Sequence, residues 1–330
     1  AISAAIETLG LSRGHRVFLP AYICGDVLTP FFRNGIGVDF YPVHEDLSID
    51  ERFIRTHLTP SVKAILVIHY FGFPQDAQIL KHLREHHDLH VIEDCAHAFL
   101  SEANGTPLGS LGDATVFSLR KTIPVDHGGI LVAQNHTALD RRTPDPRISP
   151  ALWRRTAIRL IEGFEFRSGV SILRILRRMR RPTTGPEPGE SANNTEARRR
   201  VGIPRPTGRV LQNLDYVNIR NTRRSHFRAI ADRLEGRRGI RPLFPNLPDG
   251  VCPMAFPVLV DNRDEIQRSL NRDGIDAFPW PFLPQYLGPG WDGARHLADH
   301  VMLLPIHQDL QRRHVDHMLA ALDRALPTLR

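Results

Sequence analysis

The first 135 residues alternate between short apolar runs and longer segments in which apolar side chains recur with helical spacing. The apolar runs predict strands at residues 16–20, 38–43, 63–69, 89–92, 114–119 and 130–133. Helical spacing predicts helices at residues 1–9, 25–33, 49–58 and 75–87. Strands that alternate with helices over such short distances form βαβ units, so we expect a mainly parallel central sheet with helices on both faces.

The C-terminal part of the chain has a sparser pattern, which predicts a smaller α/β domain. Its expected elements are a long helix at 211–234, a strand within 250–260, a helix at 264–271 that stops at Gly274, and a terminal helix at 308–326. Residues 277–284 are rich in proline and aromatic side chains, which favours a loop that lines a site.

Residues 153–181 differ from both flanking regions, because they contain nine arginines against two glutamates with apolar residues interleaved. This pattern predicts a basic amphipathic helical insertion. It could be a solvated face laid on the large domain, or a surface for anionic lipid or a phosphate-rich substrate, with weak membrane contact. Residues 182–208 are rich in Pro, Gly, Ser, Asn and Arg and predict a linker. We therefore expect a large domain at 1–145, the insertion and linker at 146–208, and a small domain at 209–330.

Composition narrows the class of protein. The chain has 330 residues, 41% of them hydrophobic, and three widely separated cysteines at positions 24, 95 and 252. An odd number of distant cysteines argues against a disulfide framework and fits a reducing cytosol. No apolar run approaches the roughly 20 residues of a membrane span, and no signal peptide is apparent, so a cytoplasmic protein is expected.

Charge and histidine content change this picture little. The net charge of +7 is a weak indication of anionic ligands, and no nucleic acid is expected as a partner. The histidine-rich stretch at 86–90 lacks the spacing of common metal motifs and predicts a solvated loop, so no metal site is expected.

Chemistry-bearing residues concentrate between positions 91 and 133. The pair Glu93-Asp94 follows one apolar run, a glycine-rich segment at 109–113 precedes the next, and Lys121 stands seven residues before Gly128. Ligands of parallel α/β sheets bind beyond the carboxyl ends of the strands. Because Asp94, Ser118 and Lys121 each follow such an end, we expect them to share one site.

These residue types suit catalysis with pyridoxal phosphate (PLP). That cofactor needs a lysine amine for a Schiff base, a carboxylate to keep its pyridine nitrogen protonated, and donors for its phosphate. Taken singly, a lysine in a turn is usually a solvated surface residue, and an aspartate after a strand is more often a helix cap. The three residues in this order favour the cofactor site.

The same stretch, with further segments on either side, resembles the DegT/StrS family of PLP-dependent sugar aminotransferases. The matching segments are Pro20-Ala21-Tyr22, residues 63–65, residues 69–74, residues 92–98, residues 109–113, Phe117-Ser118-Leu119, Lys121 with Gly128-Gly129, and residues 303–307. The resemblance implies the type I PLP-dependent transferase fold, a homodimer, and transfer of an amino group from an amino acid, with glutamate expected, to a nucleotide-linked keto sugar.

The resemblance also implies roles for individual residues. Lys121 would carry the cofactor and then act as the general base, and Asp94 would hold the pyridinium. His97 would lie near the phenolic oxygen of the ring, and Ser118 would contact the phosphate, with Arg120 as a possible extra cationic contact.

Four further residues fall at family positions near the site. Cys24 stands where many members have an aromatic residue that stacks on the cofactor, and Tyr22 is close to it in sequence. His69 matches a position near the mouth of the site, and His307 belongs to the matching segment at 303–307, so both are candidates for substrate contact. As an alternative, a histidine at the end of a strand is often an ordinary hydrogen-bonded residue.

The chain departs from the family pattern at two places. A Gly-Ser/Thr pair that binds the phosphate lies upstream of the position matching Ala1 and is not in this sequence, and the step from Ser118 to Lys121 is three residues, shorter than in many members. Two alternatives therefore stand beside the aminotransferase. One is a dehydratase of the same family, against which Lys121 argues because sugar dehydratases tend to have histidine there. The other is a degenerate regulatory or scaffold protein that binds PLP poorly.

Overall fold

The structure is a computed structural model that describes most of the chain. The described residues are 1–87, 89–125, 128–134, 203, 205–285 and 287–326. The predicted amphipathic segment at 153–181 lies outside these residues, as does most of the predicted linker at 182–208.

The chain divides into two compact units, and each unit is assembled from separate segments of the sequence. The first unit comprises Ala1–Ile123, Gly129–Leu139 and Asp215–Arg330, so it contains both the N-terminal sheet and the C-terminal elements. The second comprises Pro124–Gly128 and Asp140–Leu214, and includes helix α7 (Arg205–Gln212). All the residues discussed below as a candidate site belong to the first unit.

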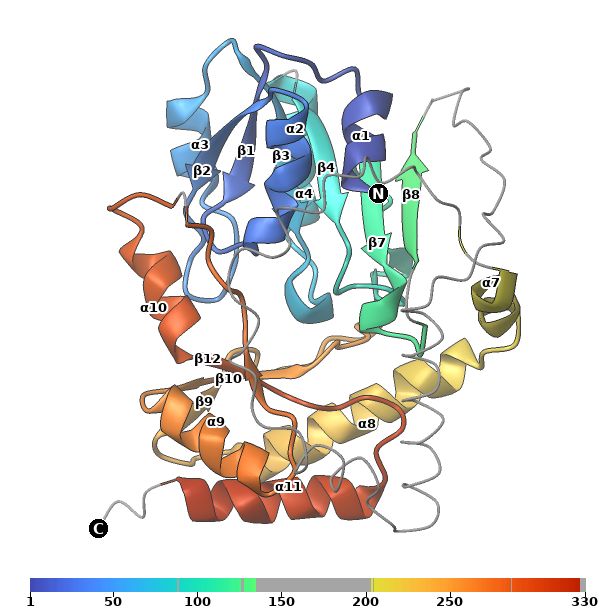
Figure 1. Cartoon of the computed structure of the whole chain (residues 1–330), viewed down its shortest axis with the longest axis vertical. Coiled ribbons are helices and arrows are strands. Elements are labelled where there is room, and N and C mark those ends of the chain that lie inside the picture. Colours follow the sequence, from blue (N-terminus) through green and yellow to red (C-terminus); the bar gives the residue numbers. More distant parts are fainter. Residues whose placement is uncertain (88, 126–127, 135–202, 204, 286, 327–330) are drawn as a thin grey trace, which may run out of the picture. The chain divides into compact units, whose positions relative to one another are not determined.

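The first unit is built around a six-stranded sheet with the order β2-β1-β3-β4-β7-β8 (Figure 1). Its strands are β1 (Arg16–Pro20), β2 (Gly37–Tyr41), β3 (Val62–Ile68), β4 (His90–Asp94), β7 (Ala114–Ser118) and β8 (Gly129–Ala133). All neighbouring pairs are parallel except β7 and β8, which are antiparallel. The predicted mainly parallel sheet is therefore confirmed, and its strand limits agree with the apolar runs to within two residues.

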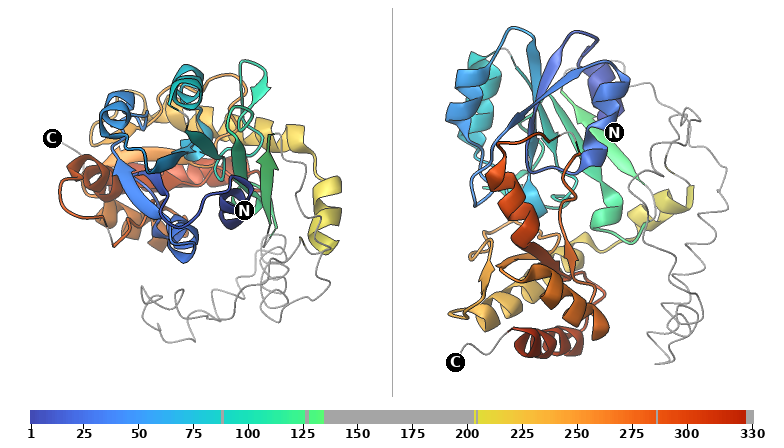
Figure 2. Two further views of the ribbon diagram at one scale, coloured as in Figure 1. Left: turned by 90° about the horizontal axis from the view of Figure 1, so that it is seen from above. Right: turned by 60° about the vertical axis from the view of Figure 1, so that its left-hand side comes forward.

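Helices cover both faces of this sheet, as expected (Figure 2). They are α1 (Ile2–Thr8), α2 (Thr29–Arg33), α3 (Glu51–His57) and α4 (Ala77–His86), with 3-10 turns η1 (Gly25–Val27), η2 (Tyr70–Gly72) and η3 (Leu119–Lys121). The side chain of Asp50 caps α3 by accepting from Phe53 N, and Asp76 caps α4 by accepting from Gln78 N. The helix predicted at 25–33 is instead divided into η1 and α2, which begins close to Pro30.

Strand register brings the carboxyl ends of the central strands level with one another. Ile68 at the end of β3 pairs with Asp94 at the end of β4, and Asp94 in turn pairs with Val116 of β7. The segments that follow β1, β3, β4 and β7 therefore emerge at the same edge of the sheet. A short hairpin, β5 (Glu102–Ala103) with β6 (Thr106–Pro107), lies between β4 and β7 in sequence.

The C-terminal part of the first unit contains a second, four-stranded sheet with the order β11-β12-β10-β9, all of it antiparallel. Its elements are α8 (Tyr216–Leu234), β9 (Ile240–Pro242), β10 (Phe256–Val260), α9 (Arg263–Arg272), β11 (Phe278–Pro279), α10 (Asp292–His300), β12 (Val301–Leu304) and α11 (Arg312–Ala325). The smaller set of α and β elements was predicted, but its antiparallel pairing was not, and neither were β9, β11, α10 and β12.

Helix α8 begins later than the helix predicted at 211–234. Its first residue is Tyr216, because the side chain of Asp215 accepts a hydrogen bond from Asn218 N and caps the helix there. Among the described helices, none has both the length and the apolar character needed to cross a lipid bilayer.

Candidate active site

The segments that leave the carboxyl edge of the large sheet carry most of the residues singled out from the sequence. Tyr22 and Cys24 follow β1, His69 follows β3, and Asp94 ends β4. Beyond them, His97 lies in the turn after β4, while Ser118 ends β7 and Lys121 ends the 3-10 turn η3.

Lys121 and His97 are in direct contact, although 24 positions separate them in the chain. The Nζ atom of Lys121 lies 2.8 Å from Nε2 of His97. The other ring nitrogen of His97, Nδ1, accepts a hydrogen bond from the backbone N–H of Phe71 at 3.3 Å. A neutral imidazole has one donor and one acceptor nitrogen, so the Phe71 N–H places the ring proton on Nε2. In this tautomer Nε2 donates and Nζ of Lys121 accepts through its lone pair, an arrangement that suits the uncharged amine.

The environment of both groups favours these neutral forms. Burial, reinforced by Lys121, holds the pKa of His97 well below 6.5. Burial also lowers the pKa of Lys121 below 10.5. Asp94 and Cys24 oppose that shift, and Arg120 adds to it. The electrostatic effect of Cys24 on Lys121 places both residues in the same neighbourhood.

Asp94 is a buried carboxylate with unused hydrogen-bonding capacity. It is 6% exposed, and its Oδ1 accepts from Ala96 N at 2.9 Å. Among the described residues, no hydrogen bond reaches its Oδ2. Burial raises the pKa of Asp94 and the nearby Lys121 pulls it down, with a raised pKa as the result. A cation beside Oδ2 would stabilise the charged carboxylate.

The backbone at Phe71 and Gly72 is shaped to present the N–H group that His97 accepts. Phe71 has φ of 54°, a conformation that is uncommon for residues with a side chain. Gly72 follows with φ of 101°, and a Cβ there would lie 2.5 Å from the carbonyl oxygen of Cys252. The ring of Phe71 also stacks on His97, with centroids 5.5 Å apart. Phe71 was not predicted from the sequence as a site residue.

Trp280 reaches the same cluster from the aromatic- and proline-rich segment at 277–284. Its ring packs edge-on against His97 with centroids 4.8 Å apart, and it also contacts Tyr22 and Phe71 at 5.3 Å. The buried hydroxyl of Tyr22 donates to the Trp280 carbonyl. The sequence predicted that this segment lines a site, but it did not single out Trp280. The position of this tryptophan between two prolines is the signal that could have identified it.

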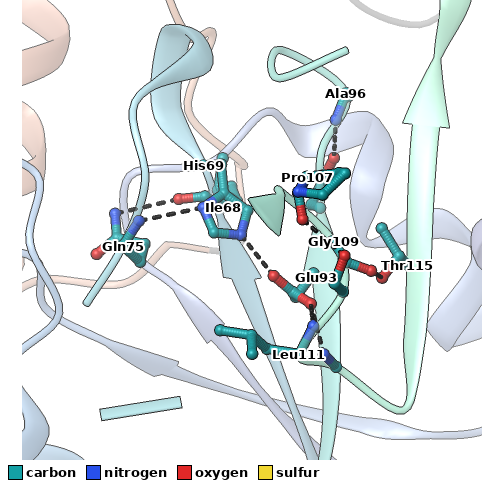
Figure 3. Close-up of polar contacts among 12 residues, drawn as sticks. Ile68, His69, Gln75, Glu93, Ala96, Pro107, Gly109, Leu111 and Thr115 are labelled. Carbon is teal, nitrogen blue, oxygen red and sulfur yellow. Dashed lines mark hydrogen bonds and ion pairs between the residues drawn. The ribbon is translucent and has the colours of Figure 1, made fainter. Parts of the chain in front are cut away.

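His69 belongs to a separate buried network, which Figure 3 shows. Its Nε2 lies 2.8 Å from Oε2 of Glu93, and its Nδ1 accepts from Gln75 N at 3.1 Å. Glu93 in turn accepts from the backbone N–H groups of Leu111 and Gly112 in the glycine-rich segment. Both ring nitrogens of His69 are hydrogen-bonded and the residue is 1% exposed, so it supports Glu93, which in turn holds the turn at 109–113. A substrate role for His69 stays a prediction.

The ligand atoms of His69, Glu93 and Cys95 all lie within 4.8 Å of one another, as in some metal sites. However, the closest pair, His69 Nε2 and Glu93 Oε2, is at hydrogen-bond distance, and the second oxygen of Glu93 is bonded to backbone N–H groups. Burial would raise the pKa of Glu93, but the hydrogen bonds from His69, Gly112 and Leu111 keep it below 4.5. The arrangement is that of a satisfied polar network.

The two remaining candidates are placed differently. Ser118 is partly buried at the end of β7, and its hydroxyl makes no hydrogen bond within the described residues. His307 lies beyond β12 with a 46% exposed side chain, and its Nδ1 is 3.6 Å from Oδ2 of Asp309. No contact joins His307 to the Lys121–His97 pair among the described residues, so a substrate role for it stays a prediction.

These side chains fit PLP. The site offers a buried amine at Lys121 with a lowered pKa and a buried carboxylate at Asp94. Within the described part of the chain, Asp94 Oδ2 and the hydroxyls of Ser118 and Thr122 make no hydrogen bond, and the Thr122 hydroxyl is buried. Aromatic surfaces of Tyr22, Phe71 and Trp280 lie around them. This is the donor set that a charged pyridine ring with an aldehyde and a phosphate requires.

The mainly parallel sheet with these residues at its carboxyl edge defines the fold as that of type I PLP-dependent transferases. An aminotransferase, TlmJ from Streptoalloteichus hindustanus, superposes with a TM-score of 0.71 at 21% identity, covering 100% of this chain and 84% of that one. At this identity the likeness establishes the fold.

The sequence comparisons point to the same family. Residues 1–143 match the sequence model of the DegT/DnrJ/EryC1/StrS aminotransferase family. GDP-perosamine synthase of Vibrio cholerae is 28% identical over 144 residues, which are 43% of this chain and 39% of that protein. The dTDP-3-amino-3,4,6-trideoxy-alpha-D-glucose transaminase of Streptomyces venezuelae is 24% identical over 332 residues, 94% of this chain and 76% of that protein. The chain thus spans about two fifths of the length of the first relative and three quarters of the second.

Proposed function

We propose that this protein is a PLP-dependent aminotransferase that moves an amino group from an amino acid, with glutamate as the expected donor, to a nucleotide-linked keto sugar. Both relatives carry a nucleotide-linked amino sugar in their names, which supports this substrate class. The observation that carries the proposal is the position of the Lys121 amine, 2.8 Å from Nε2 of His97 and within electrostatic reach of the buried Asp94 carboxylate.

When bound, PLP supplies a conjugated ring that accepts the electron pair released as a C–H bond breaks. The protein's part is to hold and move protons around that ring. Asp94 would keep the pyridine nitrogen protonated, because a buried carboxylate with a raised pKa is stabilised by a cation at its open oxygen. Lys121, whose pKa is lowered by burial, would take up a proton at Nζ and return it to a neighbouring carbon.

His97 would set the position and protonation state of Lys121 during this exchange. Because its Nδ1 is occupied by the N–H of Phe71, its Nε2 can only donate while the ring is neutral. A donor at this place would also suit a phenolate oxygen on the cofactor ring. Ser118 and Thr122 would contribute hydroxyl groups, and Trp280 would exclude water from one side of the cluster.

The test is transfer of nitrogen from isotopically labelled glutamate to a panel of nucleotide-linked keto sugars, followed by mass spectrometry. With PLP added, we expect the label in one or more sugar products and an equal amount of 2-oxoglutarate. Replacing Lys121 by alanine should remove the labelled product, whereas Lys63→Ala, at the other lysine in a family motif, should keep it. Transfer that survives Lys121→Ala would contradict the proposed role of this amine.

A further inference from the structure

Arg223 is a fully buried arginine outside the cluster described above. It lies in α8 and is 2% exposed. Its guanidinium donates to Gln308 Oε1 at 2.9 Å, Thr122 O at 2.9 Å, Met254 O at 2.8 Å and Pro253 O at 3.2 Å. Among the described residues no carboxylate forms an ion pair with it, so backbone carbonyls and one amide satisfy its hydrogen bonds.

Such an arrangement is an expensive way to stabilise a fold. A buried cation without an ion-pair partner costs desolvation free energy, and burial lowers the pKa of Arg223 accordingly. A guanidinium nevertheless stays charged, and its planar fork fixes the direction of each hydrogen bond. The residue is therefore suited to holding several chain segments in one geometry.

One set of these hydrogen bonds ends beside Lys121. Nη2 of Arg223 binds the carbonyl of Thr122, the residue that follows Lys121 and closes the 3-10 turn η3. This contact fixes the backbone from which the Lys121 side chain extends. The turn itself is closed by hydrogen bonds from Thr122 N and Ile123 N to Leu119 O.

A second set leads to His97. Nη1 of Arg223 binds the carbonyl of Met254, whose own N–H donates to Phe71 O at 2.8 Å. Phe71 N–H then donates to Nδ1 of His97. Arg223 is thus one backbone contact from Lys121 and connected through Met254 and Phe71 to the ring that Lys121 touches.

We propose that Arg223 is a positioning residue that holds Lys121 and His97 in contact by fixing the two backbone segments that carry them. The proposal rests on the proposed function only in taking Lys121 as the reacting amine. Without this clamp the turn at Lys121 would relax, the amine would gain water, and its pKa would return toward that of an exposed lysine.

The chain offers favourable conditions for a test. Its lysines are Lys63, Lys81 and Lys121 alone, and Lys81 is 65% exposed, so it serves as an internal reference. The adjacent Arg224, 8% exposed, donates to the carbonyls of Pro248 and Val251 but makes no contact with the Lys121 turn among the described residues. Arg224→Gln therefore serves as the matched control for Arg223→Gln, because it also removes a buried arginine.

The experiment is trace acetylation of the cofactor-free protein at a series of pH values, with the extent of labelling at each lysine read by peptide mass spectrometry. The groups that act on Lys121 are Asp94, His97, Cys24 and Arg120, and all are retained in the variants. We expect wild-type Lys121 to label with a midpoint below that of Lys81. Arg223→Gln should raise the midpoint of Lys121. A rise of about half a pH unit would lower the fraction of free amine about threefold at pH values below the midpoint. Arg224→Gln should leave the midpoint in place.

Arg223→Lys covers the case in which Arg223→Gln does not fold. A lysine keeps the charge but not the fork, so it cannot serve all the carbonyls, and an upward shift is again expected. An unchanged midpoint in the folded Arg223 variants, or an equal shift in Arg224→Gln, would overturn the proposal. A wild-type midpoint equal to that of Lys81 would instead contradict the proposed site itself, since the amine would then be exposed and charged.

Discussion

At the scale of single residues, the protonation of Lys121 and His97 is decided by a backbone group. The N–H of Phe71 occupies one nitrogen of His97, so the other nitrogen must donate, and the lysine amine must accept. The pKa of each is lowered first by burial. This coupling of backbone geometry to amine reactivity distinguishes Lys121 from a solvated lysine.

Asp94 acts on the same amine in the opposite direction. Its charge raises the pKa of Lys121, so removing the charge should lower that pKa further. We predict that Asp94→Asn lowers the labelling midpoint of Lys121 by about one unit, because a nearby opposite charge typically shifts a pKa by one to three units. Peptide mass spectrometry after trace acetylation measures the shift. A midpoint that stays unchanged would show that the carboxylate is protonated or distant from the amine.

The same variant should lose amino transfer, for a different reason. An asparagine cannot keep the pyridine nitrogen of PLP protonated, so transfer should become undetectable even though the amine is more available. A lower labelling midpoint of Lys121 together with loss of transfer would separate the two roles of Asp94, its effect on the pKa of the amine and its effect on the cofactor. Retained transfer in Asp94→Asn would contradict its role toward the cofactor.

Apolar runs in the sequence predicted that Asp94, Ser118 and Lys121 follow the carboxyl ends of strands, and the structure places them there. His97 was singled out by the family resemblance, and the roles of all four residues stay predictions. Phe71, Trp280 and Arg223 were not identified. Their positions depend on contacts between segments more than 25 residues apart, such as Phe71 with His97 and Arg223 with Thr122. No local periodicity or motif encodes such pairings.

At the scale of elements, the turn after β3 depends on glycine. Gly72 combines φ of 101° with a close approach to Cys252 O, whereas Gly274 has φ of 84° with open space around it. We predict that Gly72→Ala destabilises the protein by more than about 1 kcal/mol and by more than Gly274→Ala does, because both strain the backbone but only the first also clashes. Urea unfolding of the two variants measures the difference, and equal losses would mean that the backbone at Cys252 yields freely.

The glycine-rich turn at 109–113 depends on Glu93. The pKa of this buried carboxylate is lowered, so its stabilising effect is present above the unfolded value of 4.5 and is lost as the pH falls through the lower folded value. We predict that Glu93→Gln lowers the free energy of unfolding by about 1–3 kcal/mol at neutral pH, since it removes hydrogen bonds to a charged group.

The difference between wild type and Glu93→Gln should shrink as the pH falls below 4.5, and urea unfolding at neutral and acidic pH measures it. A difference that stays constant across this range would show that Glu93 is not charged in the folded protein.

The local sequence pattern predicted the strands of the large sheet and most of its helices because burial follows the apolar runs. It did not predict the antiparallel pairing of β10 with β12, which forms between segments about 40 residues apart.

At the scale of the whole molecule, the described residues include one candidate site at the carboxyl edge of the large sheet. The resemblance to the family implies that a second copy of the chain completes it. We predict a particle of about twice 37.4 kDa by light scattering after gel filtration. A monomer that still transfers amino groups would show that one copy suffices.

The central claim is that Lys121 is the lysine that carries the cofactor, and one measurement tests it most directly. The protein is incubated with PLP, reduced with borohydride, digested and examined by mass spectrometry. The account predicts a pyridoxyl group on Lys121, its absence in Lys121→Ala, and its retention in Lys63→Ala. A pyridoxyl group on Lys63 or Lys81, or on no lysine, would contradict it.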